Sequence, residues 1–212
     1  MASSATLRSG RTRRRNDPEG VRGRILDNAA RMFQERGYHS TSVHDLIHVS
    51  RVSAGALHHH FPTKKTLALA VLADRVGPVV REAWIDPVRQ AATLGRGIAA
   101  AFADIIAGVR ERGTVSGCPL NNLALELALT DVDLRDAIEG IFAEWRSALI
   151  ERIGGTRGGA RLDGRERLAA ANFVISVYSG AMNLSKATQS SAPLADAAQL
   201  LAHWVRDHQL AA

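Results

Sequence analysis

With 212 residues, 46 % of them hydrophobic, and a net charge of +6, the chain is long enough to bury a core as one large or two modest domains. A single cysteine excludes a disulfide within the chain. Because it has neither a signal-peptide pattern nor an apolar run of about eighteen residues, we expect a cytoplasmic protein that does not span a membrane. Residues 1–75 carry 13 Lys and Arg against 6 Asp and Glu, whereas residues 76–212 carry 14 against 15. The basic first third suits a polyanionic partner.

Residues 1–16 contain five arginines and too few apolar side chains to fold, so we predict a disordered basic arm. Such an arm can enter the minor groove of DNA, add non-specific affinity, or remain a solvated tail. Its candidate DNA contacts are Arg13, Arg14 and Arg15.

Three helices are predicted in residues 17–62. The first begins at an Asp-Pro-Glu sequence, with proline at the first helical position, and ends at Gly37, since glycine enters the left-handed C-terminal conformation at low cost. Ser42, followed three residues later by an aspartate, begins a short amphipathic second helix. Ser53 can cap a third helix, which Pro62 ends.

The third helix has about eight residues, too few to be stable alone. Leu57 and Phe61 lie four residues apart and can pack it on the second helix, which leaves small residues and imidazoles facing outward. Small side chains let a helix approach a DNA groove closely, and histidine can donate to phosphates or base edges. At the start of the next helix, Lys64 and Lys65 and the backbone N–H groups can hold phosphate. The candidate DNA contacts here are Ser42, Arg51, Ser53, Ala54, Gly55, Ala56, His58, His59 and Lys64.

This stretch resembles the helix-turn-helix of the TetR family of transcriptional regulators. The matching residues are Gly-Tyr at 37–38, Thr-Ser-Val at 41–43, Asp-Leu-Ile at 45–47, Val-Ser-Ala-Gly-Ala-Leu at 52–57, His-His-Phe at 59–61 and Thr-Lys-Lys-Thr-Leu at 63–67. Three positions depart from the usual pattern: His58 stands where tyrosine is common, Arg51 where glycine is, and Ile47 where alanine is. The resemblance implies a helical, homodimeric regulator with a C-terminal domain that binds a small molecule.

The rest of the chain shows helical periodicity and no strand signals, so we predict an all-α fold with about nine helices. Residues 63–84 are expected to form a connecting helix that Pro78 kinks or ends. Residues 85–212 are expected to form a larger domain for ligand binding and dimerisation. A connecting helix that belongs to both domains gives a physical route by which one domain can move the other.

A ligand cavity is suggested by aromatic and aliphatic residues drawn from several of these helices. The candidate lining residues are Trp84, Phe102, Leu123, Leu127, Trp145, Phe173 and Val177. Ordinary core packing accounts for each of them singly. A DNA-compacting protein without a ligand therefore stays open as an alternative.

The last two predicted helices, residues 165–189 and 194–208, are apolar on more than one side. A second copy of the chain can cover the side that a monomer would expose. We therefore predict a four-helix dimer interface that uses Ile175, Met182, Leu201 and Val205. Burial within one subunit is the alternative.

Other chemistry has less support in the sequence. His44 and His48 have metal-chelating spacing, but no further ligand completes a set, so we expect no metal and no cofactor. Cys118 precedes a helix start, where the helix field can lower a thiol pKa, but we favour a packing role for this small apolar residue at a helix end. No catalytic motif occurs, and Glu126 fits an ordinary solvated helix position.

The sequence thus predicts a homodimeric repressor that a small, mainly apolar ligand releases from a palindromic DNA operator. One alternative is a repressor that senses electrophiles or redox state through Cys118. A small helical enzyme is another.

Overall fold

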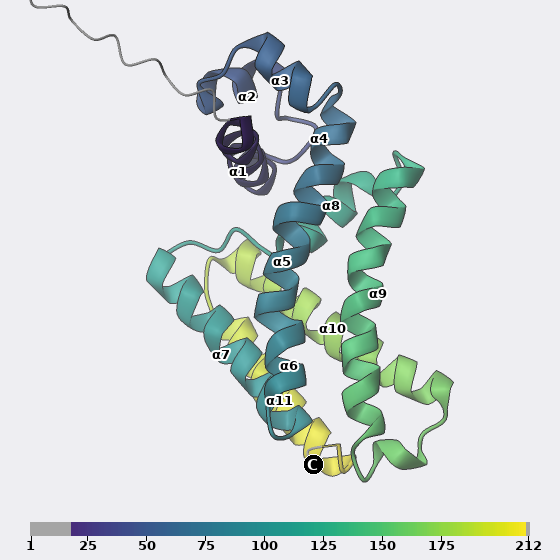
Figure 1. Cartoon of the computed structure of the whole chain (residues 1–212). Helices are drawn as coiled ribbons and strands as arrows, with labels where there is room; N and C mark the ends of the chain where they lie inside the picture. The colour runs from purple at the N-terminus through teal and green to yellow at the C-terminus, as the bar shows by residue number, and fades with distance from the viewer. Residues whose placement is uncertain (1–17, 211–212) are drawn as a thin grey trace, which may run out of the picture.

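The computed structural model describes residues 18–210, in which every regular element is a helix (Figure 1). The predicted basic arm, with Arg13, Arg14 and Arg15, lies outside the described residues. None of the helices between residues 18 and 210 is both long and apolar enough to cross a lipid bilayer. The all-α prediction is confirmed. Residues 18–210 contain nine helices, as predicted, when the segments over residues 64–90 are counted as one helix and the short 3-10 turn is left out.

The chain follows a simple order of elements. Before the C-terminal body come α1 (Pro18–Arg36), α2 (Val43–Ser50), α3 (Ala54–His60), α4 (Lys64–Val71), η1 (Leu72–Val76), α5 (Gly77–Val80), η2 (Arg81–Ile85) and α6 (Asp86–Gln90). The body itself contains α7 (Leu94–Arg112), α8 (Pro119–Leu127), α9 (Val132–Gly154), the 3-10 turn η3 (Gly159–Arg161), α10 (Gly164–Thr188) and α11 (Ala192–Asp207).

Helices α1 to α3 form a small head at one end of the molecule (Figure 1). Local capping fixes where its helices begin: the Asp45 N–H donates to Ser42 Oγ over 3.0 Å, and the Ala56 N–H donates to Ser53 Oγ over 3.1 Å. Apolar residues of α1 meet those of α2 and α3 in a shared core, which contains Ile25, Leu26, Ala29, Met32, Phe33, Leu46, Leu57 and Phe61. The short α3 is therefore held by tertiary packing.

The segments α4, η1, α5, η2 and α6 run on without a break as one connecting helix, residues 64–90. The expected end near Trp84 is wrong, because Pro78 and Pro87 each follow a π-helical turn. The Gly77 N–H donates to the Leu72 carbonyl five residues before it. A π turn holds one extra residue, so the proline ring after it avoids the carbonyl that it would meet in a regular α-helix.

The C-terminal body surrounds the lower part of the connecting helix (Figure 1). Helix α10 packs against α9 and α11, and α11 packs against α7, which also contacts α6. Trp84 of the connecting helix is fully buried in this body. One continuous helix therefore starts beside the head and contributes Trp84, Ile85 and Val88 to the core of the body.

Candidate nucleic-acid interface

The outward face of α3 is the surface that the sequence assigns to DNA. Leu57 and Phe61 are buried against the head, whereas Ala54, Gly55, His58 and His59 are exposed and Ala56 is half-buried. The exposed face thus carries small residues and two imidazoles, which suit close approach to a groove.

Gly55 lies at the start of this face, where the subunit itself leaves room. A Cβ added at this position would meet no atom closer than Ser53 Oγ, at 4.0 Å. The fold therefore does not require a glycine here. A large side chain would project outward, towards anything that α3 contacts.

Arg51 occupies the turn between α2 and α3 in the left-handed conformation, with φ 53°. A non-glycine residue is strained in this region, so glycine would fit this backbone conformation at lower cost than arginine. The Arg51 side chain is exposed beside the cap residue Ser53. Its charge is available to a phosphate.

Arg51→Gly and Arg51→Ala separate these two effects. Both changes should weaken DNA binding and lower the slope of log affinity against log salt by about one, as expected for one lost phosphate contact. Only Arg51→Gly should also raise the free energy of unfolding, by roughly 0.5–1 kcal/mol, because alanine keeps the left-handed strain. Salt titrations and urea unfolding measure the two effects. An unchanged salt slope in both variants would remove Arg51 from the interface.

The two lysines at the start of α4 differ in their surroundings. Lys64 Nζ lies 4.3 Å from the centroid of the Tyr38 ring and donates to the His39 carbonyl over 3.4 Å, and its partial burial lowers its pKa. Lys65 Nζ instead lies 2.8 Å from a carboxylate oxygen of Asp131 and 2.6 Å from one of Asp133, hydrogen bonds that raise its pKa. The expectation that Lys65 holds phosphate is therefore corrected: its charge ties α4 to the start of α9.

Further polar contacts join the head to the body, and sequence reasoning missed them. Gln34 Nε2 donates to the carbonyls of Ser116 (3.0 Å) and Gly117 (2.7 Å), and Asn122 Nδ2 donates to Gln34 Oε1 over 3.1 Å. The His39 N–H donates to Glu126 Oε2 over 3.2 Å, so Glu126 is not simply solvated. The partners in each pair are more than 80 residues apart in the chain, so no motif spacing could predict these contacts.

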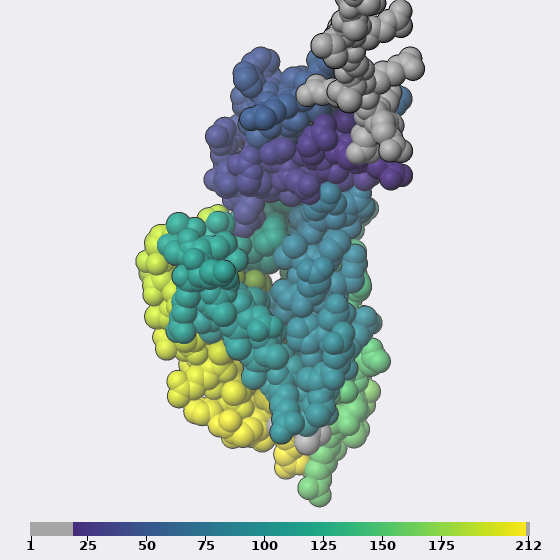
Figure 2. Space-filling view, turned by 60° about the vertical axis from the view of Figure 1, so that its left-hand side comes forward, coloured from purple at the N-terminus to yellow at the C-terminus, as the bar shows by residue number. Residues whose placement is uncertain are grey.

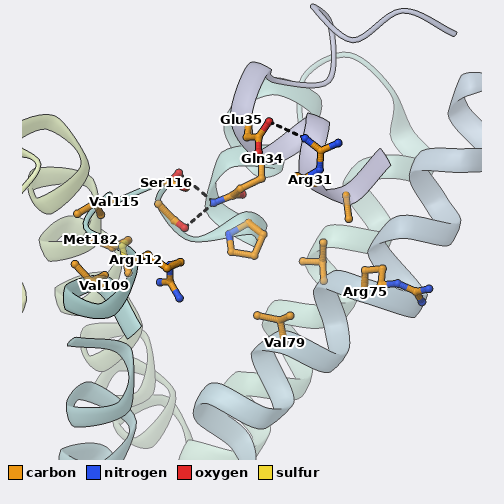
Figure 3. A pocket seen from close by; sticks show the side chains of 14 residues that line it. Arg31, Gln34, Glu35, Arg75, Val79, Val109, Arg112, Val115, Ser116 and Met182 are labelled. Atoms are coloured by element: carbon orange, nitrogen blue, oxygen red, sulfur yellow. Dashed lines mark hydrogen bonds and ion pairs between the residues drawn. The ribbon is translucent and has the colours of Figure 1, made fainter. Parts of the chain in front are cut away.

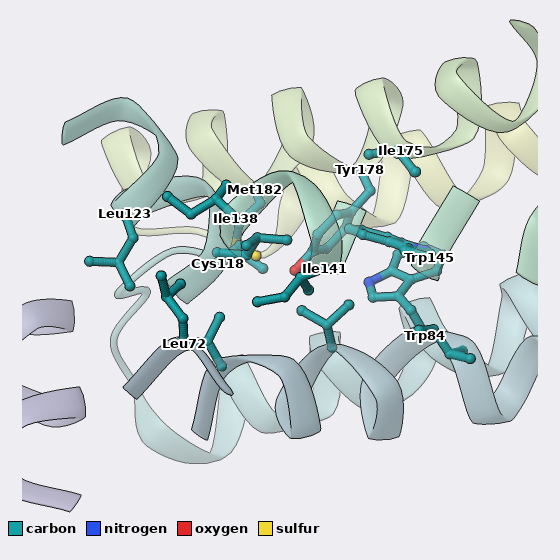
Figure 4. Close-up of a cluster of buried hydrophobic side chains, with 14 of the residues drawn as sticks. Leu72, Trp84, Cys118, Leu123, Ile138, Ile141, Trp145, Ile175, Tyr178 and Met182 are labelled. Carbon is teal, nitrogen blue, oxygen red and sulfur yellow. The ribbon is translucent and has the colours of Figure 1, made fainter. Parts of the chain in front are cut away.

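The residues predicted to line a ligand cavity do not lie together. The rings of Trp84, Phe102 and Trp145 are buried and in contact through Trp84, with centroids 5.3 Å from Trp84 to Phe102 and 5.0 Å from Trp84 to Trp145. Figure 4 shows Trp84 and Trp145 beside Tyr178 in this core. Leu123 and Leu127 are buried as well, whereas Phe173 and Val177 line a groove on the outside of α10 and α11. A ligand among the inner rings would have to displace them.

The predicted dimer residues are buried inside the subunit, although Leu201 also contributes to the floor of the outer groove of α10 and α11. Ile175, Met182, Leu201 and Val205 are each 7 % exposed or less within one subunit, so they are not available to a second copy. The exposed apolar residues of α10 and α11 are instead Leu168, Phe173, Leu184 and Leu200. The two helices are apolar on two sides, as predicted, but the assignment of the inward and outward sides was reversed.

The structure does not support a metal site at the histidine pair or a reactive thiol at Cys118. The rings of His44 and His48 are 6.3 Å apart, and no group of three His, Cys, Asp or Glu side chains in residues 18–210 is placed to hold a metal ion. Cys118 is buried, and burial raises the pKa of its thiol, so the expected lowering by the helix field does not prevail.

Comparison with known proteins agrees with this arrangement. Residues 25–71 match the family model for bacterial regulatory proteins of the tetR family, and residues 95–200 match the model for the C-terminal domain of LmrA/YxaF-like transcriptional regulators. The HTH-type transcriptional regulator LmrA of Bacillus subtilis (strain 168) is 27 % identical over 173 residues, which cover 82 % of this chain and 90 % of the relative.

Two further relatives extend the match. The HTH-type transcriptional repressor DhaR of Mycobacterium sp. (strain GP1) is 27 % identical over 186 residues, covering 82 % of this chain and 86 % of the relative. A TetR transcriptional regulator from Chloroflexus aurantiacus J-10-FL, known from its crystal structure, superposes with a TM-score of 0.78 and 26 % identity over 92 % of this chain and 98 % of that one. These relatives are regulators, which sets the enzyme alternative aside. The chain belongs to the TetR family of DNA-binding transcriptional regulators.

Proposed function

We propose that this protein is a homodimeric repressor that binds a palindromic operator and leaves it when a small, mainly apolar molecule binds. The observation that carries the proposal is the continuous connecting helix, residues 64–90, which starts just after α3 and buries Trp84, Ile85 and Val88 in the core of the body. The description of DhaR as a repressor supports the direction of control.

Dimerisation is supported by the exposed apolar face of α10 and α11, defined by Phe173, Leu184, Leu200 and the half-buried Trp204. These residues line an open groove of about 530 Å³, and the ring centroids of Phe173 and Trp204 are 4.8 Å apart. An apolar face of this kind on a regulator is best covered by a second copy. A two-fold dimer would place its paired α3 helices on half-sites about 34 Å apart.

The switch requires that the effector bind one conformation better than another. The head is attached to the body by the connecting helix and by the hydrogen bonds of Gln34 and Glu126. Lys65, with Asp131 and Asp133, ties the start of the connecting helix to α9. A shift of the body is therefore transmitted to α3. The buried and less acidic thiol of Cys118 gives no comparable support to electrophile sensing.

A mobility-shift assay on the DNA that flanks the protein's own gene tests the proposal. Binding should survive an excess of unrelated DNA and should map to a palindrome, since each subunit presents one α3. Specific binding is typically about 10³–10⁷ times tighter than binding to random DNA. Equal affinity for both DNAs would favour a DNA-compacting role instead.

A further inference from the structure

A cleft of about 370 Å³ lies where α1 meets the body, apart from both the aromatic core and the outer face of α10 and α11. Its walls come from α1, the connecting helix, the end of α7 with the loop that follows, and Met182 of α10. Figure 2 shows the surface hollowed between α7 and the connecting helix, beneath α1. The volume falls within the range of small-molecule sites, about 300–1,000 Å³.

Most of the inner wall is apolar. Its apolar side chains are Val76, Val79, Val109, Val115, Pro119 and Met182. Val79 is 47 % exposed, although its neighbours Val76 and Val80 on the same helix are buried. Because burying apolar surface is favourable, an apolar ligand that covers the exposed Val79 side chain would gain binding free energy.

Three arginines also line the cleft, and they differ in their partners. Arg31 pairs with Glu35 (3.2 Å), and Arg75 pairs with Asp27 (2.7 Å). Arg112 makes no hydrogen bond or ion pair with any residue between 18 and 210 and lies across the cleft from those two pairs (Figure 3). Its cationic group near an apolar wall is suited to a carboxylate, which a guanidinium binds through two parallel hydrogen bonds.

Gly108 helps to place this guanidinium. A Cβ added at Gly108 would lie 3.0 Å from Arg112 Nη1, so the glycine leaves room for the group to lie along the last turn of α7. The same position is favourable for a cation at a helix C-terminus. The guanidinium thus lies at the cleft and makes no hydrogen bond with any residue between 18 and 210.

We propose that this cleft binds a small apolar molecule that carries a carboxylate, with the carboxylate on Arg112 and the hydrocarbon part against Val79 and the other apolar side chains. The role of this cleft as the effector site depends on the repressor function proposed above. The effector would then be an apolar carboxylate. Its binding site would lie at the boundary between head and body, and not in the aromatic core.

Occupancy of the cleft would act on the head directly. Gln34 of α1 lines the cleft, and its side chain holds the loop carbonyls of Ser116 and Gly117. A ligand seated between α1 and α7 would compete with this closed arrangement. Because α1 packs against α2 and α3, a movement of α1 would reorient the DNA-contacting face.

Calorimetric titration of the full chain with octanoate and with octan-1-ol tests the site. Wild-type protein should bind octanoate more tightly than the alcohol of the same length. Arg112→Gln should weaken octanoate binding roughly 10- to 100-fold, as expected when a charged hydrogen-bond partner is lost, and should leave octan-1-ol binding unchanged. Val79→Trp should fill the cleft and abolish the binding of both.

Arg110→Gln is the matched control, because Arg110 lies on the same turn of α7 but is not among the cleft residues and is directed to Ser191. It should bind both probes as wild type does. Octanoate binding that is absent in wild type, or equal in wild type and Arg112→Gln, would overturn the proposal.

Repeating the titration with operator DNA separates this proposal from the function on which it rests. If the cleft is the effector site, operator should weaken octanoate binding by the same factor by which octanoate weakens operator binding. Octanoate bound at Arg112 without any effect of operator would leave the binding site in place and remove its effector role. If the protein bound operator but did not bind octanoate, the proposed carboxylate site would be wrong and the proposed repressor function would stand.

Discussion

Gly55→Trp should abolish specific operator binding, with a loss of at least about 100-fold, while the subunit keeps its stability. An added Cβ at Gly55 meets no atom of the subunit closer than 4.0 Å, so the indole can project from α3 without disturbing the head. An indole that projects from α3 would hold the helix away from the floor of the major groove. The groove is just wide enough for an α-helix, so there is no room for the extra side chain. Mobility-shift titration gives the affinity, and thermal unfolding gives the stability.

Gly140→Trp is the matched control for this experiment. Gly140 is also an exposed helical glycine, and a Cβ added there meets no atom within 4 Å, but it lies on α9. That variant should bind operator as wild type does. If Gly55→Trp also bound with full affinity, the outer face of α3 would not be the DNA-contacting surface.

Leu200→Glu should convert the dimer to a monomer and sharply weaken binding to the palindrome. Leu200 is 67 % exposed on the apolar face of α10 and α11, so in a monomer a glutamate there would stay solvated and harmless. In a dimer the same carboxylate would be buried without a partner, at a cost of several kcal/mol. Sedimentation at micromolar concentration measures the state of assembly, and operator binding follows it, because a monomer presents one α3 only.

Leu129→Glu controls for the added charge. Leu129 is 99 % exposed and lies between α8 and α9, away from that face. This variant should sediment as wild type does. A Leu200→Glu protein that remained dimeric would place the interface elsewhere on the molecule.

The sequence by itself determined the parts of this protein that depend on local spacing. Ser42 and Ser53 were predicted to start the second and third helices, and each accepts a backbone hydrogen bond at the start of α2 and α3. A cap and the donor that it satisfies lie two or three residues apart, so the signal is contained in a short stretch. The helical class, the helix-turn-helix and the family followed from such stretches.

Only the tertiary structure decided features for which the local sequence is compatible with two structures. Helix α10 is apolar on two sides, and periodicity cannot select the inner one. Only the packing of α10 against α9 and α11 buries Ile175 and Met182 and leaves Phe173 outside. A proline signal likewise predicts an end to a helix, yet the π turn before Pro78 lets the connecting helix continue.

The cleft at Arg112 and the contacts of Gln34 and Lys65 were also decided only by the tertiary structure. Gln34 meets Ser116 and Gly117 across more than 80 residues of chain, and Lys65 meets Asp131 and Asp133 across more than 60. Periodicity and capping reach only a few residues along the chain, whereas these contacts exist because separate helices pack side by side. The local sequence therefore predicted which surface should face DNA, and the packing of distant helices decided how that surface is joined to the rest of the protein.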